Sequence, residues 1–237
     1  MSIQIVVARY KEPLTWLQDA PFCDHPVVVY NKGGNDDFVR PLFPVAVVPL
    51  PNVGVDAHTF VYHIVANYDQ LADYTVFLQG SVDLEHKYRR AVQTLRTSLE
   101  RQCTVLSTRW APHPVQPTYY NFTLDKYELS HTTNTSDKRI AYLSPCPIRP
   151  FGKWYESMFG NIATGHIVYN HIMCVKREDI HKRPLAFYVG LLQMFGNEPD
   201  VQPELAHYVE RAWEAVFHPL EERNFIYGVA GDGDMRT

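Results

Sequence analysis

The sequence predicts an α/β domain in which a mostly parallel or mixed central sheet is flanked by helices. Two patterns support this fold class: short apolar runs rich in β-branched residues, and segments with helical spacing of apolar residues that alternate with them. The chain has 237 residues, 46% of them hydrophobic and 20% charged, which is enough to bury one sizeable core. We expect a single domain over residues 1–230 and a flexible, Gly/Asp-rich tail at 231–237.

Apolar runs that are continuous rather than alternating indicate strands buried on both faces. The first run covers residues 3–8, and a polar loop follows it directly. The other expected strands are residues 26–30, 45–50, 75–78 and 166–176.

Helical spacing marks the segments between and after these strands. Residues 56–69 place Phe60, Ile64, Val65 and Tyr68 on one face of a helix. Residues 104–150 contain six prolines and predict irregular structure that covers the sheet, or a lid. The further expected helices are a turn or two at 14–17, then 87–102, 184–195 and 203–217.

Composition and motifs exclude several classes of protein. The net charge of −4 argues against a nucleic-acid-binding protein, and no apolar run is long enough for a membrane span. The N-terminus lacks the pattern of a secretion signal, so we expect a cytoplasmic protein with free thiols. The glycine-rich phosphate motifs of dinucleotide-binding and P-loop proteins are also missing from the sequence.

Polar loops follow four of the expected strands, at residues 9–12, 31–37, 52–56 and 79–83. In open α/β sheets, ligands bind beyond the carboxyl ends of the strands, so these loops are the expected binding site. Mixed charge at one sheet edge suits a ligand with phosphates and hydroxyls, together with a divalent cation. The charged residues that the loops offer are Arg9, Glu12, Lys32, Asp36, Asp37, Asp56 and Asp83.

Several sequence blocks resemble a family of fungal, algal and viral proteins known only as a domain of unknown function. The blocks include Ala8-Arg-Tyr-Lys-Glu12, Tyr30-Asn-Lys-Gly33, Pro51-Asn-Val-Gly54 and Val76-Phe-Leu-Gln-Gly80. Their order is also similar to the nucleotide-sugar half of GT-A glycosyltransferases, whose fold is Rossmann-like. This resemblance implies a nucleotide-sugar half at residues 1–103 and an acceptor half with the C-terminal helices at 104–230. Enzymes of this kind in large algal viruses build capsid glycans, which would place a viral member in the host cytoplasm.

The resemblance implies roles for residues at the strand ends. Tyr10 and Glu12 match the first-strand loop that contacts the nucleoside, and Asn31 and Lys32 follow the second strand at another such place. The turn before the helix that flanks the donor resembles Asn52, Gly54 and Asp56. The residues expected to bind the nucleotide-sugar are therefore Arg9, Tyr10, Glu12, Asn31, Lys32, Asn52, Gly54, Asp56, Gln79 and Gly80.

The metal motif of these enzymes departs from the family pattern here. Gln79 stands where the first Asp is expected, and only Asp83 remains as a carboxylate. Either Asp83 alone holds Mn²⁺ or Mg²⁺ and assists catalysis, with the diphosphate and water as further ligands, or the enzyme is metal-independent.

An acceptor wall is predicted around residues 151–160. Trp154 and Tyr155 would stack on a sugar, and Glu156 would act as the catalytic base for the acceptor hydroxyl. His166 and His171 fall on opposite faces of the strand expected at 166–176, so neither is chosen as a metal ligand.

The expected function is transfer of a sugar from a nucleotide-diphosphate donor, with UDP favoured, to a glycan or other hydroxyl acceptor. A non-catalytic carbohydrate- or nucleotide-binding protein on the same scaffold is one alternative. A metal-dependent phosphohydrolase is another, and it would need clustered carboxylates from Asp36, Asp37 and Asp83.

Overall fold

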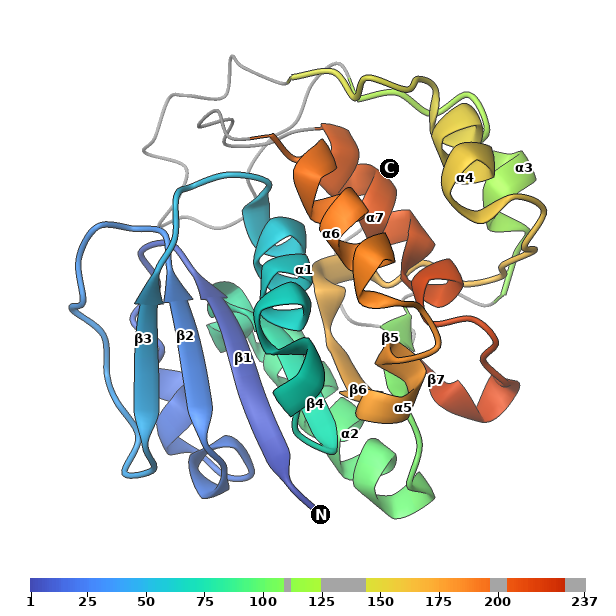
Figure 1. Ribbon diagram of the computed structural model, residues 1–237. Coiled ribbons are helices and arrows are strands. Elements are labelled where there is room, and N and C mark those ends of the chain that lie inside the picture. Colours follow the sequence, from blue (N-terminus) through green and yellow to red (C-terminus); the bar gives the residue numbers. More distant parts are fainter. Residues whose placement is uncertain (109–111, 125–143, 197–203, 229–237) are drawn as a thin grey trace.

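The computed structural model describes residues 1–108, 112–124, 144–196 and 204–228. Among these residues, seven strands form one mixed sheet (Figure 1). In spatial order they are β3 (Val45–Pro49), β2 (Val27–Asn31), β1 (Ile3–Arg9), β4 (Tyr74–Gln79), β6 (Met173–Lys176), β5 (Val105–Thr108) and β7 (Phe225–Tyr227). β1 to β4 are mutually parallel, and β6 runs antiparallel to both of its neighbours.

Alternate residues of β1 face two different hydrophobic cores. Val6 packs into one core, whereas Ile5 and Val7 pack into the other. Figure 1 shows helices on both faces of the sheet. The first core is covered by α1 (Val55–Asn67), α4 (Phe151–Phe159), α6 (Leu185–Met194) and α7 (Glu204–Val216), and the second by α2 (Glu85–Arg101). Two short helices, α3 (Val115–Tyr119) and α5 (Arg177–Ile180), complete the α-helices of the described residues.

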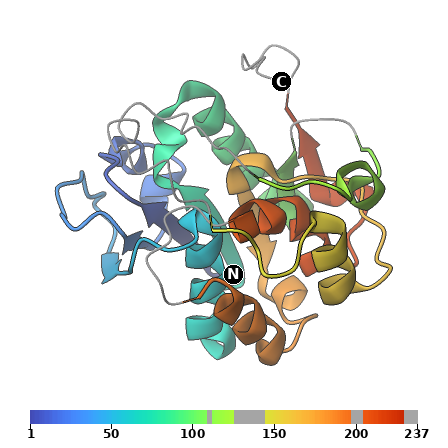
Figure 2. The same cartoon turned by 90° about the horizontal axis from the view of Figure 1, so that it is seen from above.

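The chain changes direction within the sheet between β1 and β4. From β1 it runs outward through β2 to β3, then crosses by α1 to β4 on the other side of β1. Such a switch point leaves a crevice beyond the carboxyl ends of the two strands. In register, Arg9 lies opposite Asn31, and Ala8 lies opposite Gln79, so the loops that follow meet at one edge. Figure 2 views the molecule from this edge.

The predicted fold class is confirmed, and the first four strands with α1 and α2 lie within two residues of the expected bounds. The strand expected at 166–176 begins only at Met173, because residues 169–171 form a 3-10 turn. The prediction that His166 and His171 lie on opposite faces of a strand is therefore wrong. The stretch 104–150, expected to be irregular, contains β5 and α3. The expected tail at 231–237 lies outside the described residues.

No helix in the described parts of the chain combines the length and apolar character that crossing a bilayer requires.

Gly33 is required where the loop after β2 passes over the loop after β1. A Cβ atom at this position would lie 1.4 Å from the carbonyl oxygen of Tyr10. We expect Gly33→Ala to destabilise the protein by about 1–3 kcal/mol, because the two loops must separate. Urea denaturation measures this change. The matched control is Gly190→Ala in α6, where nothing lies within 4 Å of the added atom. Equal midpoints for the two variants would contradict the predicted contact.

Candidate functional site

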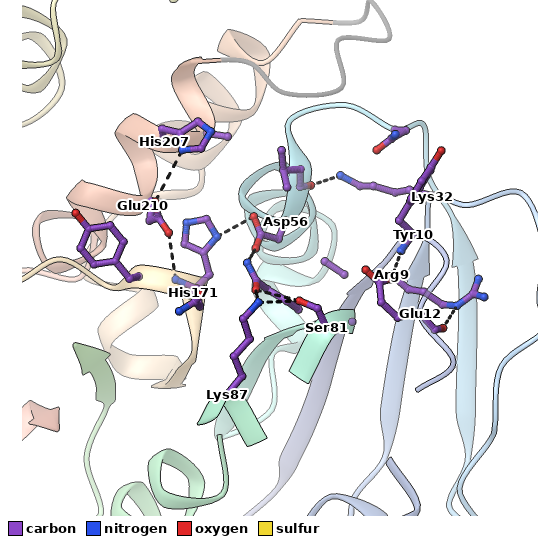
Figure 3. Close-up of a pocket in the computed structure, with 18 of the residues that line it drawn as sticks. Arg9, Tyr10, Glu12, Lys32, Asp56, Ser81, Lys87, His171, His207 and Glu210 are labelled. Atoms are coloured by element: carbon purple, nitrogen blue, oxygen red, sulfur yellow. Dashed lines mark hydrogen bonds and ion pairs between the residues drawn. The ribbon is translucent and has the colours of Figure 1, made fainter. Parts of the chain in front are cut away.

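A cavity of about 370 Å³ lies beyond the carboxyl ends of β1 and β4 (Figure 3). Its walls come from the strand-end loops, the start of α1, the turn before β6, and α7. A pocket of this size at a switch point is the expected place for a small ligand. Eight of the ten residues predicted to bind the nucleotide-sugar line it, namely Arg9, Tyr10, Glu12, Lys32, Asn52, Asp56, Gln79 and Gly80. The walls combine residues from both predicted halves of the chain.

Arg9 has a structural role that the sequence did not reveal. It is 1% exposed, and its guanidinium bonds to the oxygens of the neighbouring loops. Nε donates to the carbonyl of Glu12, Nη1 to Asn31 and the carbonyl of Asn35, and Nη2 to the Asn35 side chain and the carbonyl of Asp37. Because a guanidinium has five N–H donors, none remains for a ligand. Arg9 therefore holds the rim of the cavity together, contrary to the prediction that its side chain binds the nucleotide-sugar.

Asn31 and Gly54, the other two predicted residues, do not line the cavity. Asn31 Oδ1 accepts the Arg9 bond and a backbone N–H from Gly33, which shapes the loop after β2. Gly54 precedes α1 with a φ of 57°, a left-handed conformation that favours glycine. Asn31 therefore supports the site through its side chain, and Gly54 supports it through its backbone conformation.

The Glu12 carboxylate organises the loop after β1. Its Oε2 accepts the backbone N–H groups of Tyr10 and Lys11, at 2.8 and 3.1 Å. A Cβ atom on Gly80 would lie 2.6 Å from the same oxygen, so glycine is needed for Glu12 to fit. These contacts join the ends of β1 and β4.

Lys32 places a buried ammonium group at the cavity. Its Nζ donates to the carbonyls of Val53, at 2.6 Å, and Val55. Val55 holds its carbonyl there with a φ of 50°, an unfavourable conformation for a β-branched residue. Burial lowers the pKa of Lys32 to about 7, and the charge of Asp56 opposes this change only in part. The ammonium form is thus costly unless an anion accompanies it.

Lys87 brings a second buried ammonium group to the cavity. It lies in the first turn of α2, where the helix dipole disfavours a cation. Its Nζ donates to Gln79 Oε1 at 3.0 Å and to Ser81 Oγ at 2.9 Å. Burial lowers its pKa despite the acidic groups nearby, of which Asp56 contributes most. The prediction took candidates only from the loops after the strands and therefore missed Lys87. The sequence signal that could have found it is a lysine in the first turn of a helix, where a cation is unfavourable.

The two lysines together form a site with capacity for an anion. An ammonium group has three N–H donors. Each of the two lysines has two hydrogen-bond acceptors among the described residues. One donor on each lysine is therefore left for a ligand in the cavity. Oxygens of a phosphate or diphosphate match such donors.

Asp56 and His171 form a buried pair beside the lysines. His171 Nδ1 lies 2.8 Å from Asp56 Oδ1, an ion-pair contact rather than an in-line hydrogen bond (Figure 3). The amide of Gln79 donates to the other oxygen of Asp56 and links the pair to Lys87. Gln79 stands where the metal-binding Asp was expected, and its side chain bridges the Asp56 carboxylate and the Lys87 ammonium group.

Helix α7 covers the cavity with residues that were assigned no role from the sequence. Glu210 accepts the backbone N–H of Asn170 at 3.1 Å. The guanidinium of Arg211 lies 3.9 Å from the centre of the Phe122 ring, a cation–π contact. His207 completes this wall. Only the packing of α7 over the sheet brings these residues to the strand ends, and no local pattern signals it.

Asp83 does not line the cavity and is exposed on the 3-10 turn Gly80–Asp83. Among the described residues, no group of three or more His, Cys, Asp or Glu side chains is arranged to hold a metal ion. The residues around the cavity therefore do not fit the Mn²⁺ or Mg²⁺ site predicted at Asp83.

The residues predicted to form an acceptor wall do not line the cavity. Trp154 and Tyr155 have no exposed surface, because α4 buries both rings in the core against Phe151 and Tyr208. Neither can stack on a sugar as predicted. Glu156 is exposed on α4, accepts hydrogen bonds from Gln116 and Tyr120, and is outside the cavity. Its predicted role as the base of this site is corrected accordingly.

A family model described as "Protein of unknown function (DUF3431)" matches residues 5–225. The match spans nearly the whole chain, and the chain belongs to this family. The predicted membership of a domain family of unknown function is thereby confirmed. A search of curated proteins found no match.

Proposed function

We propose that this member of a family of unknown function is a glycosyltransferase that moves a sugar from a nucleotide-diphosphate donor to a hydroxyl acceptor. UDP is the favoured nucleotide and a glycan the favoured acceptor. The observation that carries the proposal is the pair of buried ammonium groups, Lys32 and Lys87, at a cavity on the switch point of the sheet. Together they suit a ligand with two linked phosphates better than a neutral one.

The lysines would act on the leaving group. Cleavage of the sugar–phosphate bond leaves negative charge on the diphosphate, and preorganised donors in a water-poor site stabilise that charge strongly. Glu12 and Asp56 keep the site from being uniformly cationic, which suits a ligand that also carries hydroxyls. No step is assigned to Mn²⁺ or Mg²⁺, because Asp83 does not line the cavity.

The phosphohydrolase alternative has less support. It needs clustered carboxylates, but Asp36 and Asp37 are exposed on the loop after β2, and neither lines the cavity. Asp36 instead accepts a hydrogen bond from Asn31. A non-catalytic binder on this scaffold is distinguished from a transferase by turnover of the donor.

A thermal-shift screen with UDP, GDP, CMP and TDP tests the proposal, each with EDTA, Mg²⁺ or Mn²⁺. A ligand at about a hundred times its Kd stabilises the fold by roughly 2.7 kcal/mol, which is readily measured. We expect one diphosphate to raise the melting temperature in EDTA. A shift in melting temperature that requires Mn²⁺ or Mg²⁺ would indicate that a cation takes part in nucleotide binding. No shift with any nucleotide would contradict the donor site.

Donor binding is expected to weaken at alkaline pH. An anion favours the ammonium form of Lys32, whose pKa is about 7 in the free protein, so binding takes up a proton. The affinity for UDP should be greatest between about pH 6, above which UDP is fully ionised, and the Lys32 pKa of about 7, and it should fall by up to about tenfold per pH unit above that pKa. Ionisation of UDP itself cannot cause this fall, since the last phosphate pKa is about 6 and more charge favours binding.

Calorimetry in buffers of different ionisation enthalpy measures the proton uptake. In Lys32→Met the uptake assigned to this residue should disappear. Wild-type binding without proton uptake between neutral and alkaline pH would contradict the role of Lys32.

A further inference from the structure

The proposed transfer needs a base for the acceptor hydroxyl, and Glu156 lies outside the cavity. We propose that His171 is this base and that Asp56 is the positioning residue that orients it. The proposal rests on the proposed glycosyltransferase function and adds a residue that the sequence-based prediction had set aside.

His171 is held at the cavity by an unusual turn. Asn170 and His171 both have left-handed backbone conformations, with φ of 62° and 50°. Positive φ values are uncommon outside glycine, although Asn and His adopt them more readily than most residues, and uncommon backbone conformations cluster at functional sites. The side chain of His171 is 5% exposed and its ring lies between Phe60 and Trp213. The protein therefore fixes this imidazole firmly where it lines the cavity.

The two ring nitrogens of His171 differ in their surroundings. Both are buried, and neither forms a hydrogen bond of good geometry among the described residues, but Nδ1 lies 2.8 Å from Asp56 Oδ1 whereas Nε2 has no such contact there. A carboxylate at Nδ1 favours the neutral tautomer with the proton on Nδ1, which leaves the lone pair on Nε2. A buried polar atom without a partner calls for an explanation, and an incoming hydroxyl group supplies one.

The charge on Asp56 prepares His171 to receive a proton. Burial alone would raise the pKa of Asp56, but His171, the Gln79 amide and a backbone N–H outweigh it and hold the pKa well below its usual range. For His171, burial is the largest influence and lowers the pKa, but Asp56 and Glu210 together outweigh it and raise the pKa above the ordinary value.

Two charged groups from α7 also face His171. Glu210 raises the pKa of His171, and Arg211 lowers it. Neighbouring His207 has its own pKa lowered by burial, so it stays neutral near pH 7. Asp56 is the main cause of the net rise.

The proposed step is balanced within the site. The acceptor oxygen forms a bond to the anomeric carbon as the bond from that carbon to the diphosphate oxygen breaks. The hydroxyl proton moves to His171 Nε2, and the resulting imidazolium is paired with Asp56. The electron pair of the broken bond stays on the diphosphate, beside Lys32 and Lys87. This division of roles follows the logic by which a carboxylate orients a histidine base in hydrolases.

Donor hydrolysis, with water as the acceptor, tests the proposal without a known glycan. UDP release from UDP-glucose is followed from acid to alkaline pH for wild type, His171→Gln and Asp56→Asn, and UDP binding is measured separately by calorimetry. We expect His171→Gln to slow release by about 10²–10⁴-fold with UDP affinity retained. We expect Asp56→Asn to move the acid limb of the rate profile to lower pH, because the neighbouring charge no longer supports the imidazolium.

The matched control is His166→Gln. His166 is also buried and lies 3.0 Å from a carboxylate, Glu214, but does not line the cavity, so its replacement should retain the rate.

If His171→Gln fails to fold, the acid limb of the rate profile of Asp56→Asn still tests the proposal. An acid limb at the same pH as in wild type overturns it. A wild-type rate in folded His171→Gln overturns it too. Wild-type protein that does not bind UDP, or that binds it without ever releasing it from the donor, would instead contradict the proposed function itself.

Discussion

Replacing Lys87 by methionine is expected to weaken the binding of UDP by on the order of 10²-fold. The loss is large because the ammonium is buried and its remaining donor would face the negatively charged diphosphate with little screening by water. Titration calorimetry measures the affinity, and a thermal melt of each variant confirms that the fold is retained.

Lys153→Met provides the matched control for Lys87→Met. Lys153 is exposed on α4 and does not line the cavity, so its loss should leave UDP affinity unchanged. Equal UDP affinity in Lys87→Met and wild type would remove Lys87 from the anion site.

Replacing Arg9 by methionine is expected to destabilise the protein by roughly 3–5 kcal/mol. Five oxygen atoms around the guanidinium would each lose a hydrogen-bond donor, and several of them belong to loops that form the rim of the cavity. Urea denaturation gives the free energy of unfolding. Arg40→Met, at an exposed arginine of the same loop region, should stay within about 0.5 kcal/mol of wild type. A comparably small change in Arg9→Met would show that the rim does not depend on this residue.

The edge of the sheet that carries the cavity was predictable from the sequence because its signals are local. Buried strands that end in polar residues, such as Arg9 at the end of β1 and Gln79 at the end of β4, mark strand ends wherever they occur. The parallel register then brings those ends together. A polar residue at a strand end does not, however, reveal where its side chain points. Arg9 and Lys32 both line the cavity, but Arg9 donates its N–H groups to the loops, whereas the Lys32 ammonium keeps one donor for a ligand.

The rest of the site depends on tertiary structure. From the sequence, Trp154 and Tyr155 fit a surface that stacks on a sugar as well as a buried core. Only the packing of α4 shows that they belong to the core. His171 reaches Asp56 through a left-handed turn for which its sequence carries no glycine. β5 and β7 have four and three residues, too few for a periodic pattern to stand out.

The most direct test of the central claim is the release of UDP from UDP-sugars by wild-type protein and Lys87→Met, measured in parallel at a donor concentration that saturates wild type. We expect slow but steady release by wild type, with the rate in the variant reduced to that of the buffer. Saturable binding of the donor with no release by wild type, across a panel of sugars and acceptors, would contradict sugar transfer and leave a nucleotide-sugar-binding protein.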